Sequence, residues 1–140
     1  MITEITVDGF RSLSSFSMPI KLGLNILVGP NGSGKTNIIL FFEFLSRIAT
    51  DPLSEAISKC GGAGSIFQKT NEGGLENRFS ASIEGSIHEN LERDHKEFSY
   101  IFDFTVEISE ERDEIYYKEQ RFRFFSRSLR KNQKELGFRH

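Results

Sequence analysis

The feature that most constrains this chain is a run of eight residues in its first quarter. The run is Gly29-Pro30-Asn31-Gly32-Ser33-Gly34-Lys35-Thr36. It matches the phosphate-binding pattern GxxxxGK[ST] at every fixed position. With ordinary residue usage, a chance match in a chain of this length has odds of roughly 1 in 200. The pattern binds phosphate only where a strand leads into the loop and a helix leads out of it, so its flanks decide what it means.

Both flanks have the required pattern. Leu24–Val28 is short and apolar, which predicts a buried strand that leads into the loop. Ile38–Ala49 predicts a helix that is apolar nearly all round, and such a helix is buried, here between two sheet layers. Strand, glycine loop and helix together predict an α/β fold with a phosphate site at the start of the helix.

Each residue type in the loop suits the binding of phosphate. Gly29, Gly32 and Gly34 lack a Cβ atom, so the backbone can approach a ligand closely. The successive N–H groups of the loop form an anion-binding nest at the positive end of the helix dipole. Lys35 is predicted to contact the β- and γ-phosphates, and the Thr36 hydroxyl is predicted to bind Mg²⁺. The alternative, a glycine-rich turn with an exposed lysine, leaves the Lys-Thr pair unexplained.

Composition limits the possible classes of protein. The chain has 140 residues, 37% of them hydrophobic and 27% charged, which predicts one domain or part of one. It has no apolar run near 18 residues and no secretory signal pattern at its start, so we expect a cytoplasmic protein without a membrane partner. Cys60 is the single cysteine, which excludes an internal disulfide and a zinc site built of several cysteines.

The other segments up to residue 77 have weaker signals. Ile2–Val7 and Phe16–Ile20 predict strands, the second at a sheet edge because it contains a proline. Asp51, followed by proline, predicts the N-cap of a short helix that ends at Lys59. Residues 60–77 predict a loop because they contain five glycines and no periodic pattern.

From residue 78 the hydrophobic period changes to two. Residues 79–87, 98–108 and 115–125 alternate apolar and polar, with an acidic loop before the second segment and a charged turn before the third. Short connections between alternating segments predict an antiparallel meander. Residues 126–140 predict a basic tail, in the form of a fraying helix, or the start of a further segment.

Charge is unevenly distributed along the second half of the chain. Residues 89–119 contain eleven acids and four bases, whereas residues 121–140 contain seven bases and one acid. Such asymmetry can mark a segment that binds nucleic acid or a protein partner, but more often it marks a solvated face. Both interpretations stay open from the residues alone.

The loop and its helix resemble those of a known family. The run Gly-Pro-Asn-Gly-Ser-Gly-Lys-Thr-Asn-Ile-Ile that starts at Gly29 resembles the phosphate loop of ABC-type ATPase heads. Asn31 and Asn37 are typical of the DNA-acting subgroup, which contains SMC proteins, RecF, double-strand-break repair heads, and the OLD- and Septu-like ATPases of phage defence. Phe10-Arg11, at the end of the first predicted strand, also resembles that subgroup. The resemblance covers about residues 1–50.

The resemblance implies an α/β fold class, the N-terminal lobe of an ABC-type P-loop head with an added antiparallel layer over residues 1–125. It implies that residues 29–37 bind ATP with Mg²⁺, and that Arg11 contacts the nucleotide unless it is a surface residue at a strand end. Gln68 is a candidate for the family's Mg²⁺-coordinating glutamine, with an exposed loop amide as the alternative. The partners implied are a second head that sandwiches two ATP molecules, DNA, and a nuclease or other effector.

Two parts of the family's catalytic site have no counterpart in these residues. The family's catalytic strand ends in Asp-Glu, but its nearest candidate here, Tyr100–Phe104, has phenylalanine after Asp103. The LSGGQ-like signature segment has no match. We therefore expect a C-terminal lobe outside these residues to supply both parts, and ATP hydrolysis only where it does so.

The alternative function is a nucleotide-sensing module that binds ATP without turnover and regulates a partner protein. A small P-loop kinase is disfavoured by Asn31 and Asn37, which are unusual in the kinase loop, and by the lack of an evident acceptor region.

Overall fold

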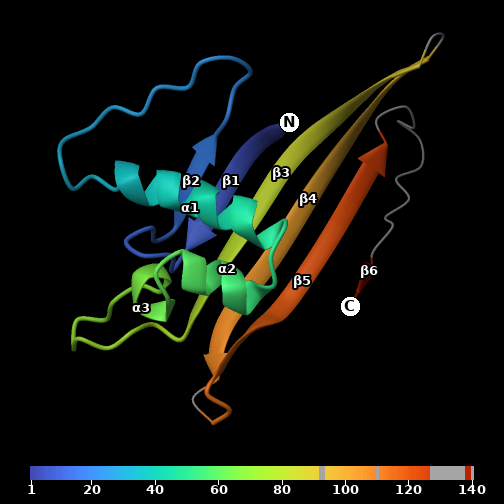
Figure 1. Ribbon diagram of the computed structural model, residues 1–140. Coiled ribbons are helices and arrows are strands. Elements are labelled where there is room, and N and C mark those ends of the chain that lie inside the picture. The colour runs from blue at the N-terminus through green and yellow to red at the C-terminus, as the bar shows by residue number, and fades with distance from the viewer. Residues whose placement is uncertain (92–93, 110, 127–137, 140) are drawn as a thin grey trace.

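The computed structural model describes residues 1–91, 94–109, 111–126 and 138–139. In this part of the chain a six-stranded sheet, in the order β2-β1-β3-β4-β5-β6, forms one layer. Three helices lie over one face of the sheet (Figure 1). All neighbouring strands pair antiparallel.

The first two strands agree with the sequence. β1 (Ile2–Asp8) pairs with β2 (Phe16–Pro19), so that Ile5 lies opposite Met18. β2 is the edge strand, as its proline predicts, because proline has no N–H group for a second neighbour. β1 is central, and its Ile5 side chain is fully buried.

The predicted antiparallel meander is confirmed. It consists of β3 (Arg78–Leu91), β4 (Asp94–Ser109) and β5 (Glu114–Ser126). The acidic loop predicted between the first two of these strands is wrong, because backbone pairing continues from His88 opposite Glu97 to Leu91 opposite Asp94. An antiparallel hairpin can keep polar residues within its strands where the sheet faces water, so polarity alone did not mark its end.

The end of the chain only partly meets its prediction. Most of residues 126–140, predicted as a tail, lies outside the described residues. Phe138–Arg139 forms β6 and pairs with Arg121 and Phe122 of β5. This pair extends the sheet by a sixth, very short strand instead of a helix.

The helices begin and end close to the predicted positions. α1 (Lys35–Ile48) starts three residues before the predicted first residue, α2 is Leu53–Lys59, and α3 (Ala63–Ile66) lies inside the predicted loop. The prediction of Asp51 as N-cap is wrong: the cap position of α2 is Pro52 and has no side-chain hydrogen bond. None of the helices in the described part is long and apolar enough to cross a membrane.

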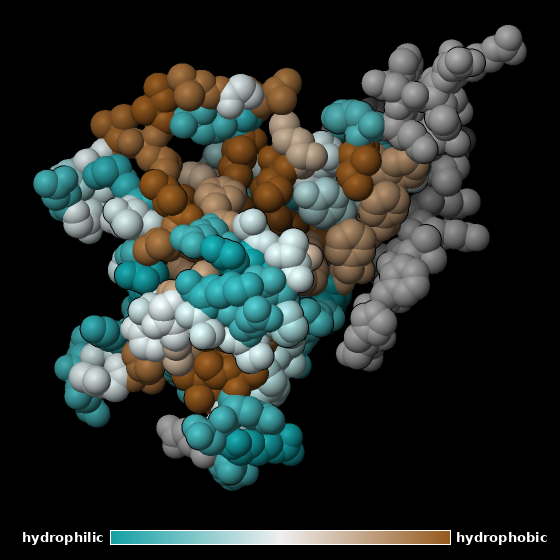
Figure 2. Space-filling view, viewed as in Figure 1, coloured by the Kyte–Doolittle hydropathy of each residue, from teal (hydrophilic) through white to brown (hydrophobic). Residues whose placement is uncertain are grey.

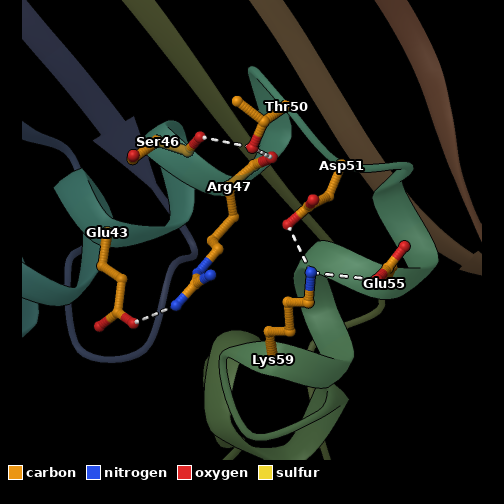
Figure 3. A network of polar contacts seen from close by, with 7 residues as sticks. All are labelled: Glu43, Ser46, Arg47, Thr50, Asp51, Glu55 and Lys59. Carbon is orange, nitrogen blue, oxygen red and sulfur yellow. Dashed lines mark hydrogen bonds and ion pairs between the residues drawn. The ribbon is translucent and has the colours of Figure 1, made fainter.

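Asp51 instead takes part in a group of ion pairs at the corner between α1 and α2 (Figure 3). Lys59 Nζ lies 3.1 Å from Asp51 Oδ2 and 3.0 Å from Glu55 Oε1, and its hydrogen bonds to Glu55 and Asp51 raise the pKa of Lys59. Arg47 pairs with Glu43 one turn earlier on α1, at 3.7 Å. These groups are solvent-accessible, so they orient the corner more than they stabilise it.

A cluster of phenylalanines joins the helices to the sheet. Phe79 of β3 is 1% exposed and lies at the centre of the cluster. Its ring centroid lies 5.4–6.3 Å from those of four other rings, which belong to Phe10, Phe44, Phe67 and Phe104. Most of these pairs are edge to face, an arrangement that adds to the burial of apolar area. The cluster holds α1 and the segment after α3 against the sheet.

The segment before the phosphate loop differs from its prediction. Leu24–Val28 is not a strand, and residues 21–30 are all exposed. Leu24 is 85%, Ile26 72% and Val28 90% exposed, and Figure 2 shows this apolar stretch as a brown arc that stands out from the body. In the described part of the chain no strand pairs with it, and an extended segment without a neighbour has no partners for its backbone groups.

The prediction that α1 is buried all round is wrong for the same reason. Ile38, Phe41 and Phe44 face the sheet and are buried, whereas Ile39 is 62% exposed. The described residues form one sheet layer, and α1 lies on it with its other side uncovered. An apolar helix surface and an apolar extended segment are therefore exposed next to each other in the sequence.

The aromatic cluster gives a test of this fold. Phe79→Ala is expected to lower the free energy of unfolding by about 3–5 kcal/mol, because the change leaves a cavity among four rings. Phe122→Ala is the matched control, since Phe122 lies on β5 and is 38% exposed, and its loss should be clearly smaller. Urea unfolding followed by circular dichroism measures both, and equal losses would contradict a core centred on Phe79.

Candidate nucleotide-binding site

The phosphate loop needs its glycines for two different reasons. Gly32 and Gly34 have φ of 84° and 91°, a left-handed conformation that other residues adopt with strain. Gly29 lies so close to Ser33 that a Cβ atom on Gly29 would be 2.7 Å from the Ser33 hydroxyl oxygen. The loop therefore turns twice into left-handed backbone and folds tightly on itself before the helix starts.

Gly34 is the N-cap residue of α1, and its carbonyl accepts the first helical hydrogen bond from Ile38 N at 3.1 Å. The first turn of α1 contains no acidic residue, so no negative side chain within it competes for the unpaired N–H groups there. A pocket of about 400 Å³ opens at this point. Its lining residues are Asn31, Gly32, Gly34, Lys35, Thr36 and Asn37. Six of the nine predicted residues in 29–37 thus line one pocket at the positive end of a 14-residue helix.

The ammonium group of Lys35 lies within the loop. Its Nζ atom donates hydrogen bonds to the carbonyl oxygen of Gly29, to that of Pro30 at 2.7 Å, and to the Ser33 hydroxyl at 3.3 Å. These acceptors are uncharged, and an anion forms stronger, charge-assisted hydrogen bonds with an ammonium group. The lysine is therefore placed to exchange loop carbonyls for a phosphate.

A second pocket, of about 450 Å³, adjoins the first through Asn37, which lines both. The residues that line it are Arg11, Ser12, Asn37, Gly64, Ser65, Phe67, Gln68 and Lys69. It brings the turn after β1 together with the segment after α3, at the start of α1. The two cationic side chains among these residues, Arg11 and Lys69, suit an anionic or polar ligand.

Arg11 is joined directly to the start of α1. Its Nε donates to Asn37 Oδ1 at 2.9 Å, and its Nη1 donates to the Ser65 carbonyl oxygen at 2.5 Å. Asn37 Nδ2 in turn donates to the Ser12 hydroxyl at 2.5 Å. The structure places Arg11 beside the loop's helix, which is the location that its predicted role requires.

Gln68 lies in the second pocket and not in the one that contains Thr36. Gln68 also lines a third pocket, together with Asp8 and Arg78. Its backbone N–H donates to the Gly9 carbonyl at 3.0 Å. This position gives no support to Gln68 as a ligand of the same metal ion as Thr36, so that role stays a prediction.

The chemistry of the loop pocket fits a magnesium ion that comes with its nucleotide. Thr36 supplies a hydroxyl, and no carboxylate is among the residues that line this pocket. Across the described ranges, no group of three or more histidine, cysteine or acidic residues forms a metal site. Mg²⁺ keeps several waters and binds phosphate oxygens readily, so one protein hydroxyl is a usual share of its ligands.

Asp103, part of the nearest match to the family's catalytic strand, is engaged elsewhere. Its carboxylate accepts a hydrogen bond from Ser82 Oγ at 2.7 Å and pairs with Arg123 Nη2 at 2.7 Å. These partners are on the neighbouring strands β3 and β5. Asp103 therefore belongs to a row of polar groups across the sheet and is not one of the residues that line the phosphate-loop pocket.

Sequence reasoning missed five residues of the second pocket, namely Ser12, Gly64, Ser65, Phe67 and Lys69. Ser65 is 54 positions from Arg11 and Ser12 is 25 positions from Asn37. No motif marks them, because they meet only through tertiary packing. The basic Lys69 within a glycine-rich segment was the one signal available.

Comparison with known proteins finds a match over residues 24–138 to the family described as "AAA domain, putative AbiEii toxin, Type IV TA system". The DNA replication and repair protein RecF of Shewanella loihica is 34% identical over 58 residues, which are 40% of this chain and 16% of that protein. The DNA double-strand break repair Rad50 ATPase of Methanopyrus kandleri is 44% identical over 39 residues, 28% of this chain and 4% of that protein. The matched segments thus span a small part of these relatives.

A solved structure described as "Structural biochemistry of ATP-driven dimerization and DNA stimulated activation of SMC ATPases" aligns with a TM-score of 0.40 and 18% identity. The alignment covers 84% of this chain and 69% of that one.

The family match and the relatives confirm the predicted resemblance to ATPase heads of the RecF and double-strand-break repair type. They also confirm the predicted fold class, an α/β P-loop lobe with an added antiparallel sheet.

The left-handed glycine at the helix start gives a test of the loop geometry. Gly34→Ala is expected to destabilise the protein by about 1–2 kcal/mol, because a Cβ atom makes φ of 91° unfavourable, although it would meet only ordinary contacts there. Gly64→Ala is the matched control: its φ is not positive and nothing lies within 4 Å. Thermal unfolding compares the two, and an equally stable Gly34→Ala variant would contradict this loop conformation.

Proposed function

Because this chain belongs to the AAA-domain family whose description it matches over residues 24–138, we propose that it is the ATP-binding lobe of a DNA-associated ATPase of the RecF and SMC type. The observation that carries the proposal is the pocket at the start of α1, where five motif residues and Asn37 surround an acid-free helix N-terminus. This arrangement is the physical requirement for binding a nucleoside triphosphate.

The phosphates are proposed to bind over the amides of residues 32–36. Lys35 now donates to the carbonyls of Gly29 and Pro30. When nucleotide binds, its flexible side chain is proposed to leave these carbonyls and donate to the β- and γ-phosphates. Thr36 holds Mg²⁺, which supplies charge neutralisation between the phosphates. The remaining loop residues, Pro30, Asn31 and Ser33, shape the turn around them.

The nucleoside end is proposed to extend into the second pocket. This pocket shares Asn37 with the first, so one ligand fits across both. Arg11 lies at their junction through its hydrogen bond to Asn37. The preference for ATP over GTP rests on the family resemblance, because no group that reads the base has been identified in the pocket.

A second lobe is proposed to complete the head. Four of the five side chains in the exposed segment Leu24–Val28 are apolar, and Ile26, Leu27 and Val28 follow one another, as in a strand buried on both faces. Ile39 adds an apolar surface on α1. Strands from a further lobe would pair with this segment and cover that surface. The same lobe is proposed to bring the Asp-Glu strand and the signature segment, and two such heads to form a homodimer around two ATP molecules.

DNA is the proposed partner, on the basis of the relatives' printed descriptions as DNA repair proteins. The basic stretch 121–139 is a weaker support than its charge suggests. Arg121 pairs with Glu119 and Arg123 pairs with Asp103, each at 2.7 Å, so two of its bases are already engaged. Control of a nuclease effector, a role in phage defence and a cytoplasmic location are further parts of the proposal that rest on resemblance.

The alternative is a nucleotide sensor that binds ATP without hydrolysing it. One observation favours it: the carboxylate nearest to the family's catalytic pattern, Asp103, is bound to Ser82 and Arg123 in the sheet. Release of phosphate from ATP by the full-length protein separates the two functions, since the sensor binds nucleotide but releases none.

Replacement of the loop lysine tests the proposal. Lys35→Ala is expected to weaken binding of Mg²⁺-ATP to the full-length protein by about tenfold to a hundredfold, because it removes a charge-assisted hydrogen bond to phosphate. Lys21→Ala, at an exposed position outside the pocket, is the matched control and should bind as the wild type does. Isothermal titration calorimetry measures both. Unchanged affinity in Lys35→Ala would refute phosphate binding at this loop.

A further inference from the structure

Arg11 has an unusual backbone for its residue type. Its φ is 53°, in the left-handed region, which costs a residue with a side chain about 1–3 kcal/mol. The surrounding turn holds it there: Arg11 N donates to the Ile66 carbonyl at 2.7 Å, and Leu13 N donates to the Phe10 carbonyl at 2.8 Å. Strain of this kind persists where the surrounding structure holds a residue in place, often at a functional site.

The side chain of Arg11 connects two elements that are far apart in sequence. One bond reaches Asn37, two residues after Lys35 on α1, and the other reaches the Ser65 carbonyl in α3. The backbone of Arg11 adds the bond to Ile66, also in α3. A single residue therefore joins the start of the phosphate-loop helix to α3 through three hydrogen bonds.

The segment that contains α3 has buried anchors at its centre and an exposed end: Ile66 and Phe67 are each 1% exposed. Phe67 is anchored in the aromatic cluster, 5.4 Å from Phe79 between ring centroids. After it, Glu76 N donates to the Gln68 carbonyl at 2.7 Å, which closes a small hairpin. Residues 71–78 are all exposed. Segment 61–76 thus consists of α3, anchored by the buried Ile66 and Phe67 and by Arg11, followed by an exposed hairpin.

We propose that Arg11 is a positioning residue that transmits occupancy of the phosphate loop to segment 61–76, so that this segment is a nucleotide-responsive surface element. The inference rests on the proposed nucleotide site. A bound nucleotide gives the guanidinium a charged or polar neighbour on its pocket side, and this neighbour restricts the orientation of Arg11. A fixed guanidinium keeps its bond to Ser65, which makes opening of α3 and the hairpin less frequent.

Hydrogen–deuterium exchange on the full-length protein tests this link, with and without Mg²⁺-ATP. The most informative amide is that of Gln68, because its hydrogen bond to the Gly9 carbonyl joins the segment to the turn after β1 and breaks when the segment opens. The amides of Ser65 and Phe67 donate within the segment, to Gly62 and Ala63, and report unfolding of α3 itself. In the wild type we expect saturating nucleotide to slow their exchange about tenfold, the effect of one strengthened hydrogen bond. The amides of residues 29–36 should slow as well, since they contact the phosphates.

Two variants remove the link. Arg11→Lys keeps the positive charge but lacks the planar fork that reaches two acceptors, and Asn37→Ala removes the acceptor on α1 while leaving Arg11 in place. At saturating nucleotide both variants should still protect residues 29–36 but lose the added protection at 61–70. Arg47→Ala removes a different guanidinium of α1, one that pairs with Glu43, and should respond as the wild type does.

The outcomes separate the two proposals. If nucleotide protects 61–70 equally in the wild type, Arg11→Lys and Asn37→Ala, Arg11 does not carry the link and the inference is overturned. The same follows if residues 29–36 are protected in the wild type while 61–70 are unchanged, although the nucleotide site then stands. If nucleotide protects neither segment of the wild type, the proposed nucleotide site itself falls.

Discussion

Packing of α1 against the sheet through Phe41, Phe44 and Phe10 determines where the phosphate site lies. Phe10 is at the end of β1, and its ring meets that of Phe41 edge to face at 5.2 Å. This contact fixes the first half of α1 beside the turn that contains Arg11. The second pocket follows from that contact, because Arg11 and Ser12 of the turn and Asn37 of α1 line it together. The first pocket adjoins it at the start of α1 through Asn37.

The same packing leaves the other side of the loop unsupported. The glycine turn starts α1 correctly, yet the ten residues before position 31 make no buried contact. A phosphate loop needs rigid amides on both of its sides to hold a ligand, since ordering a flexible loop on binding reduces affinity. Order at the helix end and exposure at the strand end together explain why a further lobe forms part of the proposed function.

The sequence predicted well those features that depend on local pattern. The motif located the loop and the start of the helix within three residues, and period-two alternation located the three strands of the meander. The glycine positions were predicted from backbone chemistry, and Gly32 and Gly34 have the positive φ that this chemistry requires. These features are encoded within a few consecutive residues, so no knowledge of distant parts of the chain is needed to find them.

Other features depend on distant partners and could not be predicted in this way. An apolar run such as Leu24–Val28 becomes a strand only where another strand pairs with it, and none in the described residues does. The bond from Arg11 to Ser65 spans 54 positions without a motif. Asp51 had the residue type of a helix cap, but an ion pair with Lys59 was also within reach, and side-chain competition of this kind has no signature in the sequence.

The central claim is that a nucleoside triphosphate binds at the start of α1. A crystal structure of the full-length protein with Mg²⁺ and a non-hydrolysable ATP analogue tests it most directly. The account predicts phosphates over the amides of residues 32–36, Mg²⁺ on the Thr36 hydroxyl, and Lys35 turned from the carbonyls of Gly29 and Pro30 toward the phosphates. A triphosphate bound elsewhere, with Lys35 still on those carbonyls, would contradict it.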